Sequence, residues 1–179
     1  MQELLAAMRD ATAVTHAVVE STSHGLALRK LEHCACDIAV VYNITADHLD
    51  YHGTREAYVA AKARLFASTG RVAKGRPRAT VLNADDRSFA ELRPHVRVPL
   101  IGYGFDAPAD LHGTVVEATA AGSRVAVSGR WERWRYVGAD ASAFNVANAL
   151  AAAAVALTQG MDLPEIGAGL ASFGGVPAG

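Results

Sequence analysis

Three short polar runs hold the side chains of this chain that could do chemistry. They are Glu-Ser-Thr-Ser-His-Gly at residues 20–25, Asn-Ile-Thr-Ala-Asp-His-Leu-Asp at 43–50 and Asn-Ala-Asp-Asp at 83–86. Glu20 offers the hard carboxylate oxygen that Mg²⁺ prefers, and His48 can join such a site when phosphates and waters supply the other ligands. Taken alone, each run could instead do no more than cap the helix that follows it.

The segments around these runs are typical of a three-layer α/β domain. Apolar runs predict buried strands at residues 15–20, 37–43 and 79–82, and each precedes one of the polar runs. Helical spacing predicts helices at residues 2–11, 54–67 and 143–160, and another that begins near Pro164. Alternating strands and helices indicate a mainly parallel sheet, and ligands bind outside the carboxyl ends of its strands. We therefore expect the three polar runs to lie near one another.

The remaining part of the chain has a different pattern. Four short β candidates between residues 98 and 137 are separated by Gly, Ala and Ser, which predicts a small antiparallel subsheet. A chain of 179 residues suits a single domain. Thr54 is the expected N-cap of the helix at 54–67. Lys62 falls on that helix, where a lysine ordinarily faces solvent.

Composition excludes several classes of function. The formal net charge is −1, so no overall field attracts nucleic acid or an anionic membrane. No apolar run reaches the roughly 18 residues of a membrane span. Cys34 and Cys36 lack the second ligand pair of a zinc site. On a strand they are not expected to form an internal disulfide, and we interpret them as reduced thiols of a cytoplasmic protein.

The segment at residues 43–66 resembles the signature of the Mur ligases, which build the peptide of peptidoglycan precursors. Its core is His-Leu-Asp-Tyr-His-Gly at 48–53, followed by Ala-Ala-Lys at 60–62. The other runs that resemble this family follow in its order, at residues 20–26, 83–86, 144–150 and 172–177. Within the family, the segment is most similar to enzymes that add meso-diaminopimelate or lysine to UDP-N-acetylmuramoyl-L-alanyl-D-glutamate. It is less similar to folylpolyglutamate and cyanophycin synthetases.

The resemblance implies a role for each matching residue. Glu20 would bind the Mg²⁺ shared with the ATP phosphates, and His48 a second Mg²⁺ near the γ-phosphate. Lys62 would be carbamylated by CO₂, and the resulting anion would help to hold the second metal. Only a neutral amine reacts with CO₂, so we expect a lowered pKa at Lys62. These three residues form the expected catalytic and metal-binding set.

The resemblance also implies the substrates and the reaction. Asn145 and Asn148 would contact the adenine and ribose of ATP. The residues expected at the UDP-N-acetylmuramoyl-peptide are Thr22, Ser23, His24 and Lys30. The substrate carboxylate would attack the γ-phosphate to form an acyl phosphate, which the incoming amine then converts to an amide.

Two departures from the family limit these expectations. No Gly-x-x-Gly-Lys-Thr/Ser phosphate loop occurs in the sequence, and the chain stops at Gly179 where the family continues into a C-terminal domain. We therefore expect residues 1–179 to form an incomplete Mur ligase central domain, P-loop NTPase-like in fold and inactive alone. The alternative is a non-catalytic remnant that binds a nucleotide or a protein. A missing first strand would expose a flank of the sheet, which predicts a homodimer or a complementing chain.

Overall fold

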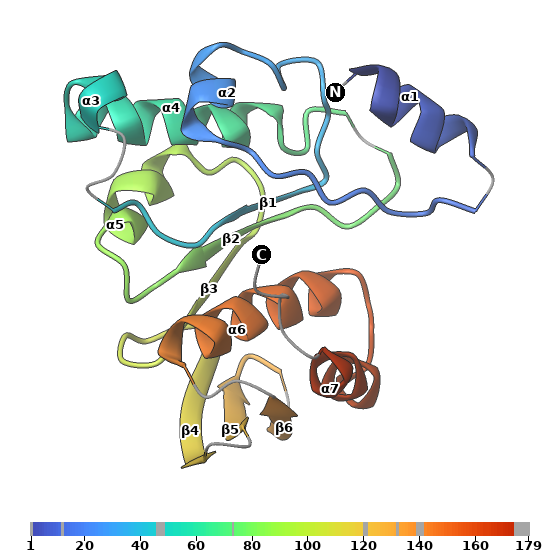
Figure 1. Cartoon of the computed structure of the whole chain (residues 1–179), viewed down its shortest axis with the longest axis vertical. Helices are drawn as coiled ribbons and strands as arrows, with labels where there is room; N and C mark the ends of the chain where they lie inside the picture. Colours follow the sequence, from blue (N-terminus) through green and yellow to red (C-terminus); the bar gives the residue numbers. More distant parts are fainter. Residues whose placement is uncertain are drawn as a thin grey trace.

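One six-stranded sheet between two layers of helices makes up the fold (Figure 1). The computed structural model describes residues 2–11, 13–45, 49–72, 74–119, 122–131, 133–138 and 142–173. The strands are β1 (Ile38–Val41), β2 (Ala79–Asn83), β3 (Leu100–Gly104), β4 (Leu111–Thr119), β5 (Gly122–Gly129) and β6 (Trp134–Gly138). Their order across the sheet is their order along the sequence. The predicted α/β class, with helices flanking a largely parallel sheet, is confirmed.

The helices divide between the two faces of the sheet. They are α1 (Gln2–Asp10), α2 (Ser23–Ala27), α3 (Leu49–His52), α4 (Arg55–Ser68), α5 (Ser88–Leu92), α6 (Ala143–Thr158) and α7 (Leu163–Ser172), with a 3₁₀ turn η1 (Arg93–His95). One buried core lies under α2, α4 and α5, and a second lies under α6 and α7. On β2, Val81 belongs to the second core and Leu82 to the first, as the alternation of a strand requires.

The N-caps of the two longest helices, α4 and α6, follow from the local sequence. Thr54 accepts a hydrogen bond from the N–H of Ala57 at 3.2 Å, which confirms it as the N-cap of α4. Ser142 accepts one from the N–H of Asn145 in the same way at the start of α6. These caps fix the residue at which each helix begins.

Strand β4 extends the sheet beyond the end of β3. The two strands pair in parallel only at Tyr103 with Leu111 and at Gly104 with His112, and β4 then runs on to form antiparallel pairs with β5. The predicted antiparallel subsheet therefore exists from Leu111 onward. The first of its four expected strands, near 98–103, instead joins β2 in parallel as β3.

Asp85 holds the short connection between β3 and β4. Its carboxylate accepts hydrogen bonds from the backbone N–H groups of Phe105, Asp106 and Ala107, at 2.5, 3.1 and 2.8 Å. Burial alone would raise the pKa of Asp85, but these three donors lower it below its ordinary value. A parallel pair ordinarily needs a crossover of a dozen residues, and this carboxylate fastens a much shorter one.

The strand predicted at residues 15–20 is absent. This segment is extended but pairs with no described strand, and Val18 is fully exposed. An apolar run becomes a buried strand only beside a partner, and β1 has β2 alone as its neighbour among the described residues.

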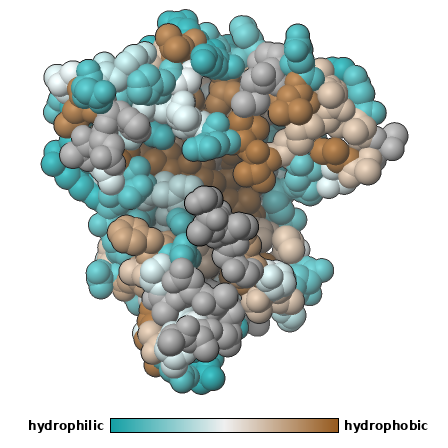
Figure 2. Space-filling view, viewed as in Figure 1, coloured by the Kyte–Doolittle hydropathy of each residue, from teal (hydrophilic) through white to brown (hydrophobic). Residues whose placement is uncertain are grey.

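Figure 2 shows apolar surface across the middle of the molecule, between the helices above the sheet and α6 below it. No helix in the described ranges is long and apolar enough to cross a membrane.

Candidate functional site

Lys62 and Glu20 lie close together where the segment before α2 meets helix α4. The ammonium of Lys62 donates to the carbonyl of Ser21 at 3.3 Å. Burial lowers the pKa of Lys62, while the nearby carboxylate of Glu20 acts in the opposite direction. Glu20 itself is exposed. The structure therefore brings together two of the three residues expected in the catalytic set, and the lysine has the lowered pKa that the sequence analysis predicted.

The start of α2 contributes two hydroxyl groups with different surroundings. Thr22 is the N-cap of α2, and its side chain accepts from the N–H of Gly25 at 3.1 Å. Ser23 is 2% exposed, and its Oγ has no hydrogen-bond partner among the described residues. A buried hydroxyl without a partner costs roughly 1–3 kcal/mol. Thr22 is thus occupied as a cap, whereas the buried hydroxyl of Ser23 has no hydrogen-bond partner among the described residues.

A group of aromatic rings joins the first polar run to the second. The ring of His24 lies 3.7 Å from that of Tyr51, measured between centroids, and His52 stacks on Tyr58 at 4.9 Å with the rings 4° apart. Tyr51 meets His52 edge to face at 4.8 Å. His24 was predicted as a substrate-binding residue, but the rings that hold it were not. The adjacent Tyr-His pair within residues 48–53 is the one feature of the sequence that could have indicated these ring contacts.

Polar side chains fasten the loop after β1 to helices α4 and α5. Asp86 accepts from the N–H of Ile44 at 3.4 Å, and Arg55 donates to the carbonyl of Ile44 at 2.9 Å. Arg55 also makes two hydrogen bonds to the carboxylate of Glu91, at 3.0 and 2.8 Å. The third polar run therefore lies next to the second, as expected, and its aspartates cap and fasten loops in the described structure.

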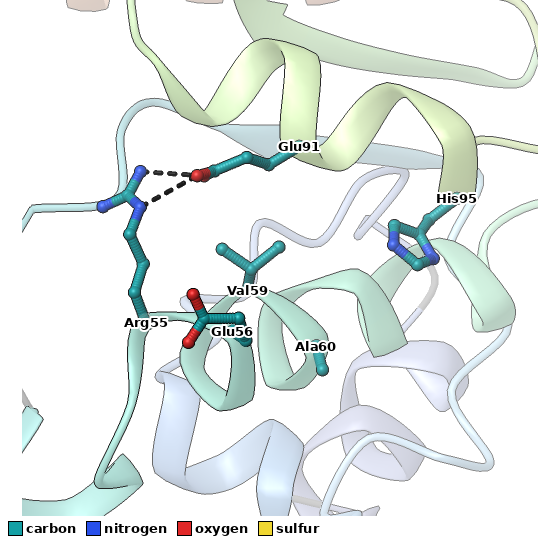
Figure 3. A pocket seen from close by; sticks show the side chains of 6 residues that line it. All are labelled: Arg55, Glu56, Val59, Ala60, Glu91 and His95. Carbon is teal, nitrogen blue, oxygen red and sulfur yellow. Dashed lines mark hydrogen bonds and ion pairs between the residues drawn. The ribbon is translucent and has the colours of Figure 1, made fainter.

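A groove of about 260 Å³ opens beside this ion pair. It is lined by Arg55, Glu56, Val59, Ala60, Glu91 and His95 (Figure 3). In Figure 3 the side chains of Arg55 and Glu91 point toward each other across one end of the groove, and His95 lies at the other end. None of the described candidate site residues lines it, so we base the site on the contacts of Lys62.

Three further candidates are described by the structure, and a fourth is not. Asn145 and Asn148 are exposed in the first turns of α6, on the opposite face of the sheet from α4. Lys30 is exposed in the turn after α2. His48 lies outside the described residues.

Of the residues expected at a magnesium ion, the structure describes Glu20 and Lys62. Glu20 provides one carboxylate, and no group of three His, Cys, Asp or Glu side chains in the described ranges is arranged to hold a metal ion. Mg²⁺ commonly takes one or two carboxylates together with waters and phosphate oxygens, so a single carboxylate fits that ion. Lys62 would add an oxygen ligand only after its amine becomes a carbamate.

These features define an α/β domain in which a half-buried lysine with a lowered pKa lies near the carboxylate of Glu20 and donates to the backbone just before α2. The Mur ligase middle domain family matches residues 1–156. The chain is 38% identical over 163 residues to the UDP-N-acetylmuramoyl-L-alanyl-D-glutamate--2,6-diaminopimelate ligase of Halalkalibacterium halodurans, covering 91% of this chain and 33% of that protein. It is also 38% identical over 190 residues to the UDP-N-acetylmuramyl-tripeptide synthetase of Roseiflexus sp., covering 98% of this chain and 36% of that protein.

Solved structures give the same result. A UDP-N-acetylmuramoyl-L-alanyl-D-glutamate--2,6-diaminopimelate ligase superposes with a TM-score of 0.77 and 29% identity, over 89% of this chain and 32% of that one. The MurF ligase of Thermotoga maritima in complex with ADP shares the fold, with a TM-score of 0.66 and 20% identity, over 85% of this chain and 33% of that one. The chain belongs to the Mur ligase middle domain family. It spans about a third of the length of the curated relatives it matches.

Proposed function

We propose that this chain is the middle domain of an ATP-dependent ligase that adds an amino acid to UDP-N-acetylmuramoyl-L-alanyl-D-glutamate in the cytoplasm. The observation that carries the proposal is Lys62, half-buried beside Glu20 with its pKa lowered by burial. The names of the relatives, at 35–38% identity over 91–92% of this chain, supply the substrate class. The retained lysine and carboxylate favour a catalytic domain over a non-catalytic remnant.

Lys62 is suited to react with CO₂. Its neutral amine attacks the carbon of CO₂. The nitrogen of the resulting adduct then loses one proton to solvent, which leaves a carbamate anion. Because burial lowers the pKa of this lysine, more of it is neutral near pH 7 than of an exposed lysine. Carbamylation replaces a cation beside Glu20 by an anion, so the two side chains then present oxygens to the same region.

The other residues would bind and orient the substrates. Glu20 would hold the Mg²⁺ that is shared with the ATP phosphates, and His48 together with carbamylated Lys62 would hold a second one. Bound Mg²⁺ offsets the charge of the phosphates. The buried hydroxyl of Ser23 would donate to the UDP-N-acetylmuramoyl-peptide, with Thr22, His24 and Lys30 beside it. Asn145 and Asn148 would contact the nucleoside of ATP from the other face of the sheet. Positioning and electrostatics supply most of the catalysis in phosphoryl transfer.

The ligation reaction needs parts that this sequence does not contain. No phosphate-loop run is present to cradle the β- and γ-phosphates. We therefore propose that the 179-residue chain on its own binds Mg·ATP weakly and has no measurable ligase activity. Completion by a further domain or chain would restore it.

The edge of the sheet offers a place for such a chain. β1 has a neighbour on one side only within the described residues, and residues 15–20 lie extended and unpaired with Val18 fully exposed. Open strand edges invite pairing with another chain. We propose a homodimer or a complementing chain at this edge. Light scattering across a dilution series, with and without added Mur ligase domains, tests this proposal. A chain that stays monomeric at every concentration and with every added domain would refute it.

Calorimetry with Mg·ATP in bicarbonate buffer tests the nucleotide site, with Glu20→Ala as the matched variant. Heat that is lost in Glu20→Ala supports the proposed metal site. Equal heat from both proteins would refute the role of Glu20. ¹³C NMR with labelled bicarbonate tests Lys62 separately. A carbamate signal that is absent from Lys62→Met supports the proposal, and the same signal in both proteins, or in neither, contradicts it.

A further inference from the structure

The two cysteines lie together in a turn just before β1. The N–H of Cys36 donates to the carbonyl of Cys34 at 3.0 Å, which closes a three-residue turn around Ala35. Both side chains are half-buried, and neither is in a disulfide. Cys34 packs against the core under α2, α4 and α5. The chain therefore places two thiols two residues apart in one turn, at a site that the proposed ligase reaction does not use.

The spacing in this turn suits a bond between the two sulfurs. Two residues of extended strand span roughly 6.7 Å, the upper limit of the roughly 4.4–6.8 Å between Cα atoms that disulfides allow. A hydrogen bond that closes a turn draws the Cα atoms of residues two apart nearer than in an extended strand. Burial raises the pKa of Cys36, and the charge of Cys34 raises it further, as expected for adjacent thiols.

Contacts outside the thiols hold the turn in place. The carbonyl of Cys36 accepts from the N–H of Gly70 at 2.9 Å, just after the end of α4. The ammonium of Lys74 donates to the carbonyl of Ala35 and pairs with the carboxylate of Asp37 at 3.2 Å. These contacts involve backbone atoms and Asp37, so none of them uses a sulfur atom that a disulfide would take up.

A metal site is the other chemistry open to a pair of thiols. His33 and Asp37 flank the pair in sequence, yet no three such side chains in the described part of the chain are arranged around a common point. Two thiolates alone fall short of the four ligands of a structural zinc site. The arrangement therefore favours thiol–disulfide chemistry over metal binding.

We propose that Cys34 and Cys36 form a reversible dithiol–disulfide pair that reacts with low-molecular-weight disulfides. One cysteine thiolate attacks a sulfur of the small disulfide, breaks its S–S bond and releases one small thiol. The second cysteine then attacks the protein sulfur of this mixed disulfide, which releases the second small thiol and forms the Cys34–Cys36 bond. Two electrons and two protons pass from the protein thiols to the small disulfide. This inference does not depend on the proposed ligase function.

Intact-mass measurement of the full chain, equilibrated with oxidised glutathione and quenched with acid, tests the proposal. The expected product is a monomer that is lighter by two hydrogens and carries no glutathione. The matched variants Cys34→Ser and Cys36→Ser each keep one thiol and should carry one glutathione. The share of mixed disulfide should be at least about tenfold lower in the unsubstituted chain, because its second thiol acts at millimolar effective concentration.

Other products would overturn the proposal. They are an unsubstituted chain that carries one or two glutathiones as readily as the single variants, a disulfide-linked dimer, or unmodified thiols. The same oxidation in urea shows whether the fold matters. Since urea removes the turn, the internal disulfide should form in lower yield there, and equal yields would show that the turn has no part in it.

Discussion

Replacement of Arg55 by lysine should destabilise the chain by about 1.5–2.5 kcal/mol, because lysine keeps the charge but cannot repeat the bonds. Arg55 makes two hydrogen bonds to Glu91 and one to the carbonyl of Ile44. Hydrogen bonds to charged groups contribute about 1.5–3 kcal/mol each when shielded, and exposed ion pairs only about 0.2–1 kcal/mol. The side chains of this pair are 20% and 28% exposed, so the expected loss lies in the lower part of the range for shielded hydrogen bonds.

Urea and thermal unfolding measure this loss. For a domain of this size the melting temperature should fall by roughly 4–8 °C. Arg124→Lys is the matched control, because Arg124 pairs with Glu117 at 3.0 Å but both side chains are about half exposed. That control should change stability by less than about 0.5 kcal/mol. Equal losses in the two variants would refute the reasoning from burial and geometry.

The pH dependence gives an independent check on the same pair. The hydrogen bond from Arg55, together with the charges of Arg55 and Arg87, lowers the pKa of Glu91 from its ordinary value of 4.5. A carboxyl group whose pKa is lower in the folded state contributes stability above pH 4.5 and loses it as pH falls through its folded value. The difference between the unsubstituted chain and Arg55→Lys should therefore hold at pH 7 and shrink in acid. A constant difference down to pH 2 would contradict this assignment.

Three further substitutions test other parts of the structure. Leu150→Ala shortens a fully buried side chain of α6 and should lower the free energy of unfolding in urea by about 2–4 kcal/mol. A loss below about 1 kcal/mol would show that the core collapses around the smaller side chain. Asp85→Asn should lower the free energy of unfolding by about 1 kcal/mol after allowance for solvent screening. It should also speed the hydrogen exchange of the amides from Phe105 to Ala107. Unchanged exchange would show that the carboxylate does not hold the loop. Thr54→Ala removes the N-cap of α4 and should cost about 1 kcal/mol, whereas Thr54→Ser should be nearly neutral.

Local patterns predicted the long helices and missed the short ones. Helix α4 has fourteen residues, enough for its apolar spacing and its Thr54 cap to be recognised. Helices α2 and α3 have five and four residues, less than two turns, so no period can be read from them. The apolar run at 15–20 reads as a strand by composition, but strand formation depends on a partner that a local pattern does not contain.

The candidate site could be predicted only in part for the same reason. Lys62 and Glu20 were found through the family resemblance, and nothing in their spacing of 42 positions indicates that they meet. The contact between His24 and Tyr51 likewise joins two segments through packing. Ser23 was expected to be a substrate ligand, but its burial arises only in the assembled fold and cannot be seen in the sequence. The aspartates of the third run match the alternative of simple capping.

The order of the six strands also bears on how the chain folds as the ribosome makes it. Each strand from β2 onward pairs with the one synthesised just before it. At a synthesis rate of about 5–20 residues per second, each newly formed edge of the sheet stays unpaired for only seconds before the next strand emerges. No strand has to be inserted later between two that are already paired, so each pairing closes a loop within a short stretch of chain. Among the described strands, β1 and β6 are the two edges of the sheet, and β1 is the edge that is already open when synthesis of the later strands begins.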